Sequence, residues 1–228
     1  MMTGMNLAVD HLLYVGPTLD PLVNHARLMT GVLPTPGGRH VGKGTHNALT
    51  GLGEGAYLEL LALDDTQPEG GDFADAITGV GTASLHAWCV RTDDGDALAA
   101  RLDAMRCSPV RESMSRVTPE GDTLAWELLF PQGHTFAGTA PFFIAWGDTP
   151  HPASTLPAAA TLDHLTVWQR DPDPLRAWLR DVGLDDARVE VLKAPARGLR
   201  AALHGRRGAF TLRGAAGGMD LAARGQTP

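Results

Sequence analysis

Four side chains that could bind a metal ion or support catalysis stand in apolar surroundings in this sequence. His11, His86 and His164 each occupy the second position of a short apolar run, at offsets of 75 and 78 residues, and Glu59 lies between two leucines. Imidazole nitrogen and carboxylate oxygen are ligands that suit divalent Fe, Mn, Ni, Co or Zn. A carboxylate in a half-buried strand needs a partner or a metal, because an unpaired buried charge is costly. The alternative for each histidine is a hydrogen-bonded core or edge residue.

The near-equal spacing of the histidines indicates a repeated unit that is longer than the repeats of a solenoid. Each histidine run is followed by helix-start residues and an amphipathic pattern, which predicts helices over 18–31, 93–105 and 171–183. Strand-like segments separated by tight-turn residues follow each helix. We interpret His164 as a mark of common ancestry rather than as part of a second site.

The order of these elements predicts two complete units and a shortened third. Each complete unit reads strand, helix, strand, strand, strand, whereas the third is expected to be a partial βαββ unit packed on the first two. The predicted boundaries are 5–63 and 83–148 for the two units of one paired domain (5–149), 150–160 for a proline-rich linker, 161–214 for the third unit and 215–228 for a flexible tail.

Two βαβββ units in tandem, the first opening with Asp10-His11 and closing with YLELL at 57–61, resemble the vicinal oxygen chelate superfamily of glyoxalases, extradiol dioxygenases and bleomycin-resistance proteins. More narrowly, four strings resemble its glyoxalase-like domain group: PGGRH at 36–40, GTHNAL at 44–49, AYLEL at 56–60 and FFIAWGD at 142–148. The resemblance implies an α+β fold in which the paired units form a cup-shaped mixed sheet.

The resemblance also implies a metal site inside the cup, with His11 and Glu59 from the first unit and His86 from the second. Two imidazoles and one carboxylate form a facial ligand set that leaves positions open for substrate. Glu59 is in addition the predicted catalytic residue. Strand alternation agrees within each segment, since His11 shares a face with Leu13 and Glu59 shares a face with Leu61.

The sequence departs from the family pattern in the last strand of the second unit. Ala145 stands where related sequences are expected to carry an acid, and alanine cannot bind a metal. Glu127 is the substitute if the strand assignment is shifted by one residue. The alternative to a metal role for Glu59 is a salt bridge to Arg39 or Arg116.

Other candidates would line the cup and contact a substrate. His46 and Asn47 are adjacent, so only one of them can face the cavity of a regular strand, and we expect it to be His46. Arg116 could hold a substrate carboxylate through a paired contact. Trp88, Trp126 and Trp146 could supply aromatic walls for a small organic molecule, while core packing is the favoured interpretation of Trp88.

The composition argues against several classes of function. The 228-residue chain has a formal charge of −7 and no Lys/Arg block longer than Arg206-Arg207, so it lacks the basic surface that binds nucleic acid or a membrane. No apolar run approaches the ~18 residues of a membrane span, and no signal-peptide pattern is present, which predicts a cytoplasmic protein. Cys89 and Cys107 cannot form a disulfide framework and are expected to be packing residues.

Three functions follow from these observations. The leading hypothesis is a metal-assisted lyase, isomerase or dioxygenase that acts on a small vicinal-oxygen substrate with the help of a divalent ion. The alternative is a non-catalytic protein that binds or sequesters a small molecule, as bleomycin-resistance members do. The third is a structural role through contacts in a homodimer.

Overall fold

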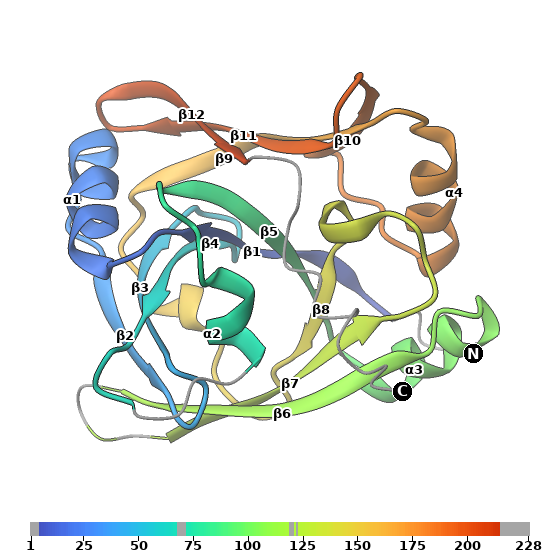
Figure 1. Ribbon diagram of the computed structural model, residues 1–228, viewed down its shortest axis with the longest axis horizontal. Coiled ribbons are helices and arrows are strands. Elements are labelled where there is room, and N and C mark those ends of the chain that lie inside the picture. Colours follow the sequence, from blue (N-terminus) through green and yellow to red (C-terminus); the bar gives the residue numbers. More distant parts are fainter. Residues whose placement is uncertain (1–4, 68–71, 119–120, 122, 215–228) are drawn as a thin grey trace.

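The computed structural model describes residues 5–67, 72–118, 121 and 123–214, so the predicted tail at 215–228 lies outside the described residues. Two sheets make up the structure: a closed barrel of strands β1 to β8 and a four-stranded second sheet of β9 to β12 (Figure 1). No helix within the described ranges has the length and apolar character needed to cross a membrane.

The first two units have the predicted βαβββ order. The first consists of β1 (Leu7–Val15), α1 (Leu19–Thr30), β2 (Thr35–His40), β3 (Thr45–Gly51) and β4 (Tyr57–Leu63). The second consists of β5 (Ser84–Thr92), α3 (Gly95–Ala104), β6 (Pro109–Val117), β7 (Thr123–Pro131) and β8 (Phe142–Ala145). Short 3-10 turns lie at Ala137–Thr139 and Pro152–Ser154.

Local sequence signals explain where the helices start and stop. The carboxylate of Asp94 accepts a hydrogen bond from the backbone of Ala97 and thereby caps the start of α3. α1 ends at Gly31, whose φ of 75° is a left-handed conformation that glycine adopts without strain.

β1 of the first unit pairs with β5 of the second, and β2 pairs with β6. These two contacts close the barrel, in which the strands follow the order β1-β4-β3-β2-β6-β7-β8-β5. β1 and β5 form a long antiparallel pair, whereas β2 and β6 meet through only two residue pairs, Arg39 with Val117 and His40 with Arg116. Closure leaves the barrel without a free edge. The barrel interior is therefore a chamber shared by both units.

The helix α2 (Asp72–Ile77) covers one end of this chamber and lies in the connection between the units (Figure 1). Ile77 is 2% exposed and packs with Leu13 and Val15 in the apolar cluster inside the barrel. α2 therefore contributes an apolar side chain to the inner cluster at this end of the barrel.

The third unit departs from the prediction of a shortened copy. It is a complete βαβββ unit with β9 (Ala160–Gln169), α4 (Asp173–Val182), β10 (Val189–Lys193), β11 (Gly198–Gly205) and β12 (Gly208–Gly214). Its strand order is β10-β9-β11-β12, so its first strand pairs with the second and third strands of the same unit. In the barrel units the first strand instead pairs with the fourth of its own unit. The third unit therefore forms a separate layer rather than another part of a barrel.

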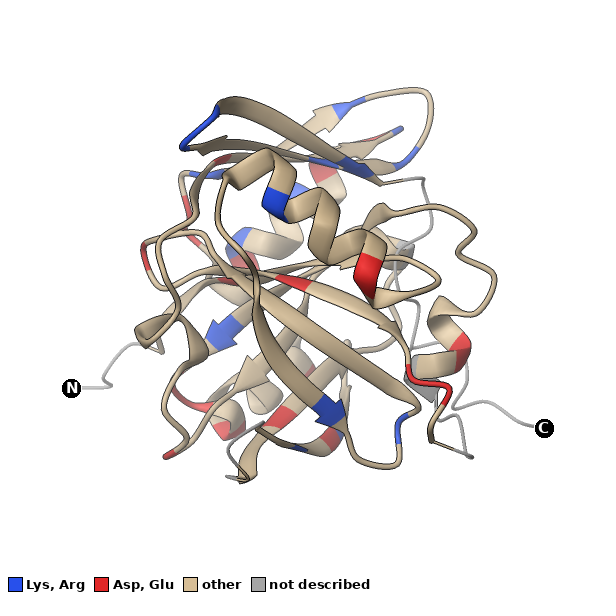
Figure 2. Ribbon diagram, turned by 90° about the vertical axis from the view of Figure 1, so that its left-hand side faces the viewer, with Lys and Arg blue, Asp and Glu red and all other residues tan. Residues whose placement is uncertain are grey.

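The main core lies between the barrel and the second sheet, which forms a layer over it (Figure 2). Trp88 is fully buried in this core, where its Nε1–H donates a hydrogen bond of 2.9 Å to the carbonyl of Thr139. Trp88 is therefore a core residue, the interpretation that the sequence favoured, because strand alternation turns it outward from the barrel. Cys89 and Cys107 are buried and free, as predicted.

Two β-bulges interrupt the pairing of β1 with β5. The extra residue is Asp10 on β1 and His86 on β5, and such a residue breaks the alternation of side chains along its strand. The next residues along β5, Ala87 and Cys89, belong to the cluster inside the barrel. His86 consequently faces away from the interior, and its Nε2 has no hydrogen-bond partner among the described residues.

We expect the His86→Leu variant to resist acid better than the wild type. Burial lowers the pKa of His86 below its ordinary value of 6.5. Below that pH the unfolded chain binds a proton that the folded chain excludes, so the free energy of unfolding falls as the pH drops. Leucine removes this proton uptake, and loss of the unpaired nitrogen adds about 1 kcal/mol near neutral pH.

Urea unfolding at about pH 7.5 and about pH 5.5 measures both effects. The matched control is His164→Leu on β9, because His164 is exposed. The control should keep the wild-type pH dependence. An equally steep decline in His86→Leu and in the wild type would contradict the expectation.

Candidate functional site

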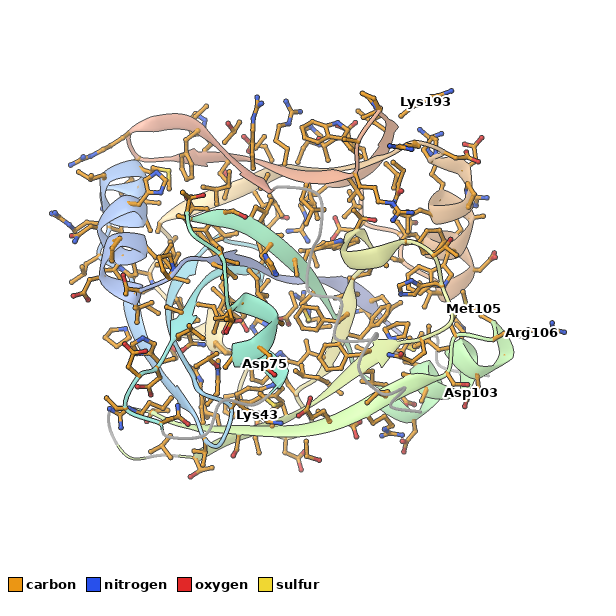
Figure 3. All side chains as sticks on the ribbon, viewed as in Figure 1. Lys43, Asp75, Asp103, Met105, Arg106 and Lys193 are labelled. Atoms are coloured by element: carbon orange, nitrogen blue, oxygen red, sulfur yellow. The ribbon has the colours of Figure 1, made fainter. Side chains whose placement is uncertain are left out.

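A narrow pocket lies inside the barrel, with an empty volume of about 480 Å³ that includes open solvent, and side chains fill the space around it (Figure 3). The two units line it unequally. The first unit supplies most of its polar groups: His11, His40, Asn47, Tyr57 and Glu59. Apart from the guanidinium of Arg116, the second unit supplies apolar and aromatic side chains: Met114, Trp126, Leu128, Phe142, Ile144 and Trp146. The pocket therefore has one polar wall and one apolar wall.

Strand register decides which neighbour faces the pocket on β3. Asn47 pairs with Leu61, which belongs to the inner cluster, whereas His46 pairs with Ala62, which belongs to the outer core. The expectation that His46 rather than Asn47 faces the cavity is therefore wrong. The amide of Asn47 is 5% exposed and lies among the polar groups of the pocket.

Glu59 is the centre of the polar wall and is 8% exposed. Its Oε1 accepts a hydrogen bond of 2.7 Å from Nδ2 of Asn47. Its Oε2 lies 3.4 Å from Nε2 of His11, and its Oε1 lies 3.7 Å from Nε2 of His40. The carboxylate thus has the partner that its burial requires, and this partner is neither of the two arginines considered from the sequence. Arg39 instead pairs with Asp64.

His11 is oriented by its neighbour Asp10, which is fully buried. Oδ1 of Asp10 lies 2.6 Å from Nδ1 of His11, while Oδ2 accepts hydrogen bonds from Nε1 of Trp146 and from Nε2 of His151 at 3.0 and 2.8 Å. The imidazole of His11 also stacks on Tyr57, with ring centroids 4.8 Å apart. These contacts direct Nε2 of His11 toward Glu59.

The charge of Asp10 is stabilised by these donors. Burial alone would raise its pKa, but the hydrogen bonds and positive charge of His11 and His151 outweigh burial and hold the pKa well below the ordinary value of 3.8. An ionised Asp10 accepts the Nδ1 proton of His11, which fixes the tautomer of the ring.

His40 completes the polar wall as a neutral group. Burial lowers its pKa below 6.5, and the charge of Glu59 opposes this effect only in part. Nε2 of His40 lies 3.3 Å from the amide Nδ2 of Asn47, and Nδ1 lies 2.9 Å from the hydroxyl of Thr45. Because an amide nitrogen only donates, Nε2 accepts and Nδ1 carries the proton.

The segment predicted as a linker contributes to the site. His151 lies in it and contacts the rings of Tyr57 and Trp146 as well as Asp10. Ala159 donates a backbone hydrogen bond to Gly51 of β3, so the segment is also fastened to the barrel. It therefore packs against the barrel at the pocket.

Sequence reasoning missed Asp10, His40 and His151 as site residues. A sequence signal could have identified Asp10, because the dipeptide Asp-His recurs at Asp163-His164. In the structure, Asp163 on β9 is again the extra residue of a bulge. His40 belongs to a string already singled out for its resemblance to the family. His151 had no signal, since it lies between prolines outside any predicted element.

The three residues proposed as metal ligands do not meet. His11 and Glu59 lie together, but His86 does not line the pocket. The other candidates on the second unit are also remote: Ile144 faces inward, so Ala145 faces outward, and Glu127 pairs with Arg111 near the surface. Among the described residues, no group of three or more His, Cys, Asp or Glu side chains could hold a metal ion.

The remaining predicted residues line the pocket. Arg116 is 5% exposed, and its Nη1 donates a hydrogen bond of 3.4 Å to Oδ1 of Asn47. The rings of Trp126 and Trp146 lie against each other, with centroids 5.3 Å apart. Both indoles border the pocket, as expected for aromatic walls.

Comparisons with known proteins agree with this architecture. A family model described as a glyoxalase-like domain matches residues 9–183. A hypothetical protein from Staphylococcus aureus is similar at 19% identity with a TM-score of 0.64, over 91% of this chain and 85% of that chain. This similarity establishes a shared fold.

Two methylmalonyl-CoA epimerases show weaker structural similarity. The enzyme from Mycobacterium tuberculosis is 19% identical with a TM-score of 0.45, over 64% of this chain and 91% of that chain. The enzyme from Streptomyces coelicolor is 18% identical with a TM-score of 0.47, over 64% of this chain and 98% of that chain. No curated protein matches the sequence significantly.

We expect Asp10→Asn to lower the free energy of unfolding by about 3 kcal/mol, because it breaks a buried charged network. In the wild type, the stability from Asp10 is complete above its unfolded pKa of 3.8 and is lost as the pH falls below it. The variant should lack this acid-side decline.

Chemical denaturation across the acid range tests both statements. Asp163→Asn is the matched control, because it changes the same dipeptide at an exposed position on β9 and should alter stability by less than about 0.5 kcal/mol. Equal losses of unfolding free energy in the two variants would contradict the expectation that the Asp10 network stabilises the fold.

Proposed function

Because the chain belongs to the glyoxalase-like domain family of the vicinal oxygen chelate superfamily, we propose that its barrel pocket is the active site of an isomerase or lyase for small vicinal-oxygen compounds. Glu59 and His11 act as its acid–base pair. The observation that carries the proposal is their geometry: a carboxylate oxygen and an imidazole nitrogen lie 3.4 Å apart at one buried cavity, and the imidazole is oriented by an ionised aspartate.

The pair can move a proton on a substrate carbon next to a carbonyl group. Glu59 takes the proton, the electrons of the C–H bond form a carbon–carbon double bond, and the carbonyl oxygen becomes an enolate. In a substrate whose reacting carbon also bears a hydroxyl group, Nε2 of His11 gives a proton to the new oxyanion and takes the proton of that hydroxyl, which becomes the new carbonyl. Glu59 then returns its proton to the former carbonyl carbon, so the isomerisation needs no oxidant or co-reactant. Asp10 orients His11 through Nδ1, so that an Nε2–H can donate to the enolate oxygen.

The apolar wall supports this chemistry by excluding water. Phe142, Ile144 and Leu128 border the pocket, and electrostatic interactions strengthen where water is excluded. A small organic substrate would contact this wall while its oxygens face Glu59 and His11.

A divalent ion, which the resemblance implies, would find only part of a ligand set here. His11 and Glu59 are suitable donors, but Nε2 of the nearby His40 already accepts from the amide of Asn47, and no group of three or more His, Cys, Asp or Glu side chains among the described residues could hold a metal ion. We therefore assign the proton transfer to the side chains themselves.

The second candidate function is ligand sequestration without reaction. It is favoured by the second unit, whose contribution to the pocket is apolar except for Arg116. Such a surface holds an organic molecule but cannot move protons.

Exchange of carbon-bound hydrogen for deuterium distinguishes the two functions. Native protein is incubated in D₂O with hydroxyacetone, lactaldehyde or pyruvate, and the C–H signals are followed by NMR. We expect exchange above the uncatalysed rate, and Glu59→Gln should lower it by about 100-fold or more, as for loss of a general base.

Glu127→Gln is the matched control, because Glu127 faces Arg111 outside the pocket. It should leave the exchange rate unchanged. An undiminished rate in Glu59→Gln would refute the acid–base role, and tight binding without exchange would support sequestration.

A further inference from the structure

The guanidinium of Arg116 is a buried cation without a buried anion beside it. Its side chain is 5% exposed, yet no carboxylate lies within ion-pair distance among the described residues. Its hydrogen bond to Asn47, at 3.4 Å, is long. A charge removed from water to this extent normally has an ionic or hydrogen-bonded partner. The guanidinium of Arg116 can therefore pair with an anion that is not part of the described chain.

Asn47 keeps Arg116 and Glu59 apart. Its Oδ1 accepts from Arg116, and its Nδ2 donates to Glu59 at 2.7 Å. The amide is thus a neutral spacer that contacts the cation on one side and the anion on the other. Because of this spacer, the guanidinium stays available on its far side.

The main chain of β2 is adapted to this arrangement. Gly37 is the extra residue of a bulge between Pro36 and Gly38. A Cβ atom at this position would lie 1.9 Å from Oδ1 of Asn47 and 2.4 Å from Nη1 of Arg116. Glycine at this position therefore gives the amide and the guanidinium the room that they occupy.

Arg116 also lies where the barrel pocket meets a second cavity. A groove of about 1090 Å³, which includes open solvent, is lined by β2 and by residues of the 150–156 segment, and it shares Arg116 and Leu49 with the pocket. Among the described residues, Arg116 donates its one side-chain hydrogen bond through Nη1. Its other guanidinium nitrogens are not among the buried nitrogens that lack a partner, which belong to His86 and Arg200, so they retain some solvent-accessible surface. An anion arriving through the groove would meet them.

We propose that Arg116 binds the carboxylate of a small carboxylic acid at this junction, while the rest of the acid extends into the barrel toward Glu59. The proposal rests on the proposed function in that the pocket is the substrate site, and it names the substrate class. A planar guanidinium matches a carboxylate through two parallel hydrogen bonds. Asn47 is a positioning residue, since it holds the guanidinium away from Glu59.

The test compares acids with neutral molecules of the same shape. 3-Methylbutanoate and benzoate are titrated into the full chain by calorimetry at about pH 7.5, beside 3-methylbutanamide and benzamide. We expect at least one acid to bind about 10-fold or more tightly than its amide, which corresponds to about 1.4 kcal/mol. Equal affinities for acid and amide, or no binding of any acid at millimolar concentration, would overturn the proposal.

Variants then assign the preference to the residue. Arg116→Gln should abolish the acid preference, and Arg116→Lys should retain part of it because the charge stays. Arg39→Gln is the matched control on the adjacent strand, since the side chain of Arg39 is 62% exposed and lies outside the pocket. An unchanged acid preference in Arg116→Gln would place the anion site elsewhere.

These measurements need no turnover, so they separate the two proposals. Acid-selective binding that depends on Arg116, without deuterium exchange, would leave the anion site standing and remove the isomerase function. Deuterium exchange that depends on Glu59, without a preference for acids, would support the isomerase function and overturn the anion site.

Discussion

The buried charge of Asp10 is the constraint on which the site depends. A carboxylate with no exposed surface is stable only if donors surround it, and here the donors come from β1, from the end of the second unit and from the segment after β8. One residue therefore orients His11, fixes Trp146 in the apolar wall and fastens His151 over the barrel. Stability and site geometry are coupled at this point, because a change that weakens the network also releases the imidazole.

The two units of the barrel have diverged in chemistry while keeping the same order of elements. The first unit places a connected set of polar groups around Glu59, whereas the second presents a largely apolar surface with Arg116 as its charged group. His86 illustrates this divergence, since its neighbours Ala87 and Cys89 face the chamber and the second histidine therefore faces outward. A repeated sequence motif consequently does not give a repeated function.

The sequence predicted most elements because apolar periodicity and turn residues are local signals. It also placed Glu59 and Arg116 in the cup, and both side chains line the pocket, since charged side chains within apolar strands need partners wherever the strands lie. The sequence did not predict the places where a single extra residue changes the register of a strand. Alternation alone could not foresee the bulges at Asp10 and His86 or choose correctly between His46 and Asn47, and the strand order of the third unit depends on long-range pairing that no local pattern encodes.

The second sheet has a consequence for assembly. It covers the outer face of β1 and β5 through the shared core, and the tight approach of Gly214 to the carbonyl of Leu85 marks how closely the layers meet. This covering layer belongs to the same chain, so its association does not depend on protein concentration, as it would if a second molecule supplied it. Dilution therefore cannot strip this layer from the barrel, and any pairing between two copies must use a different face.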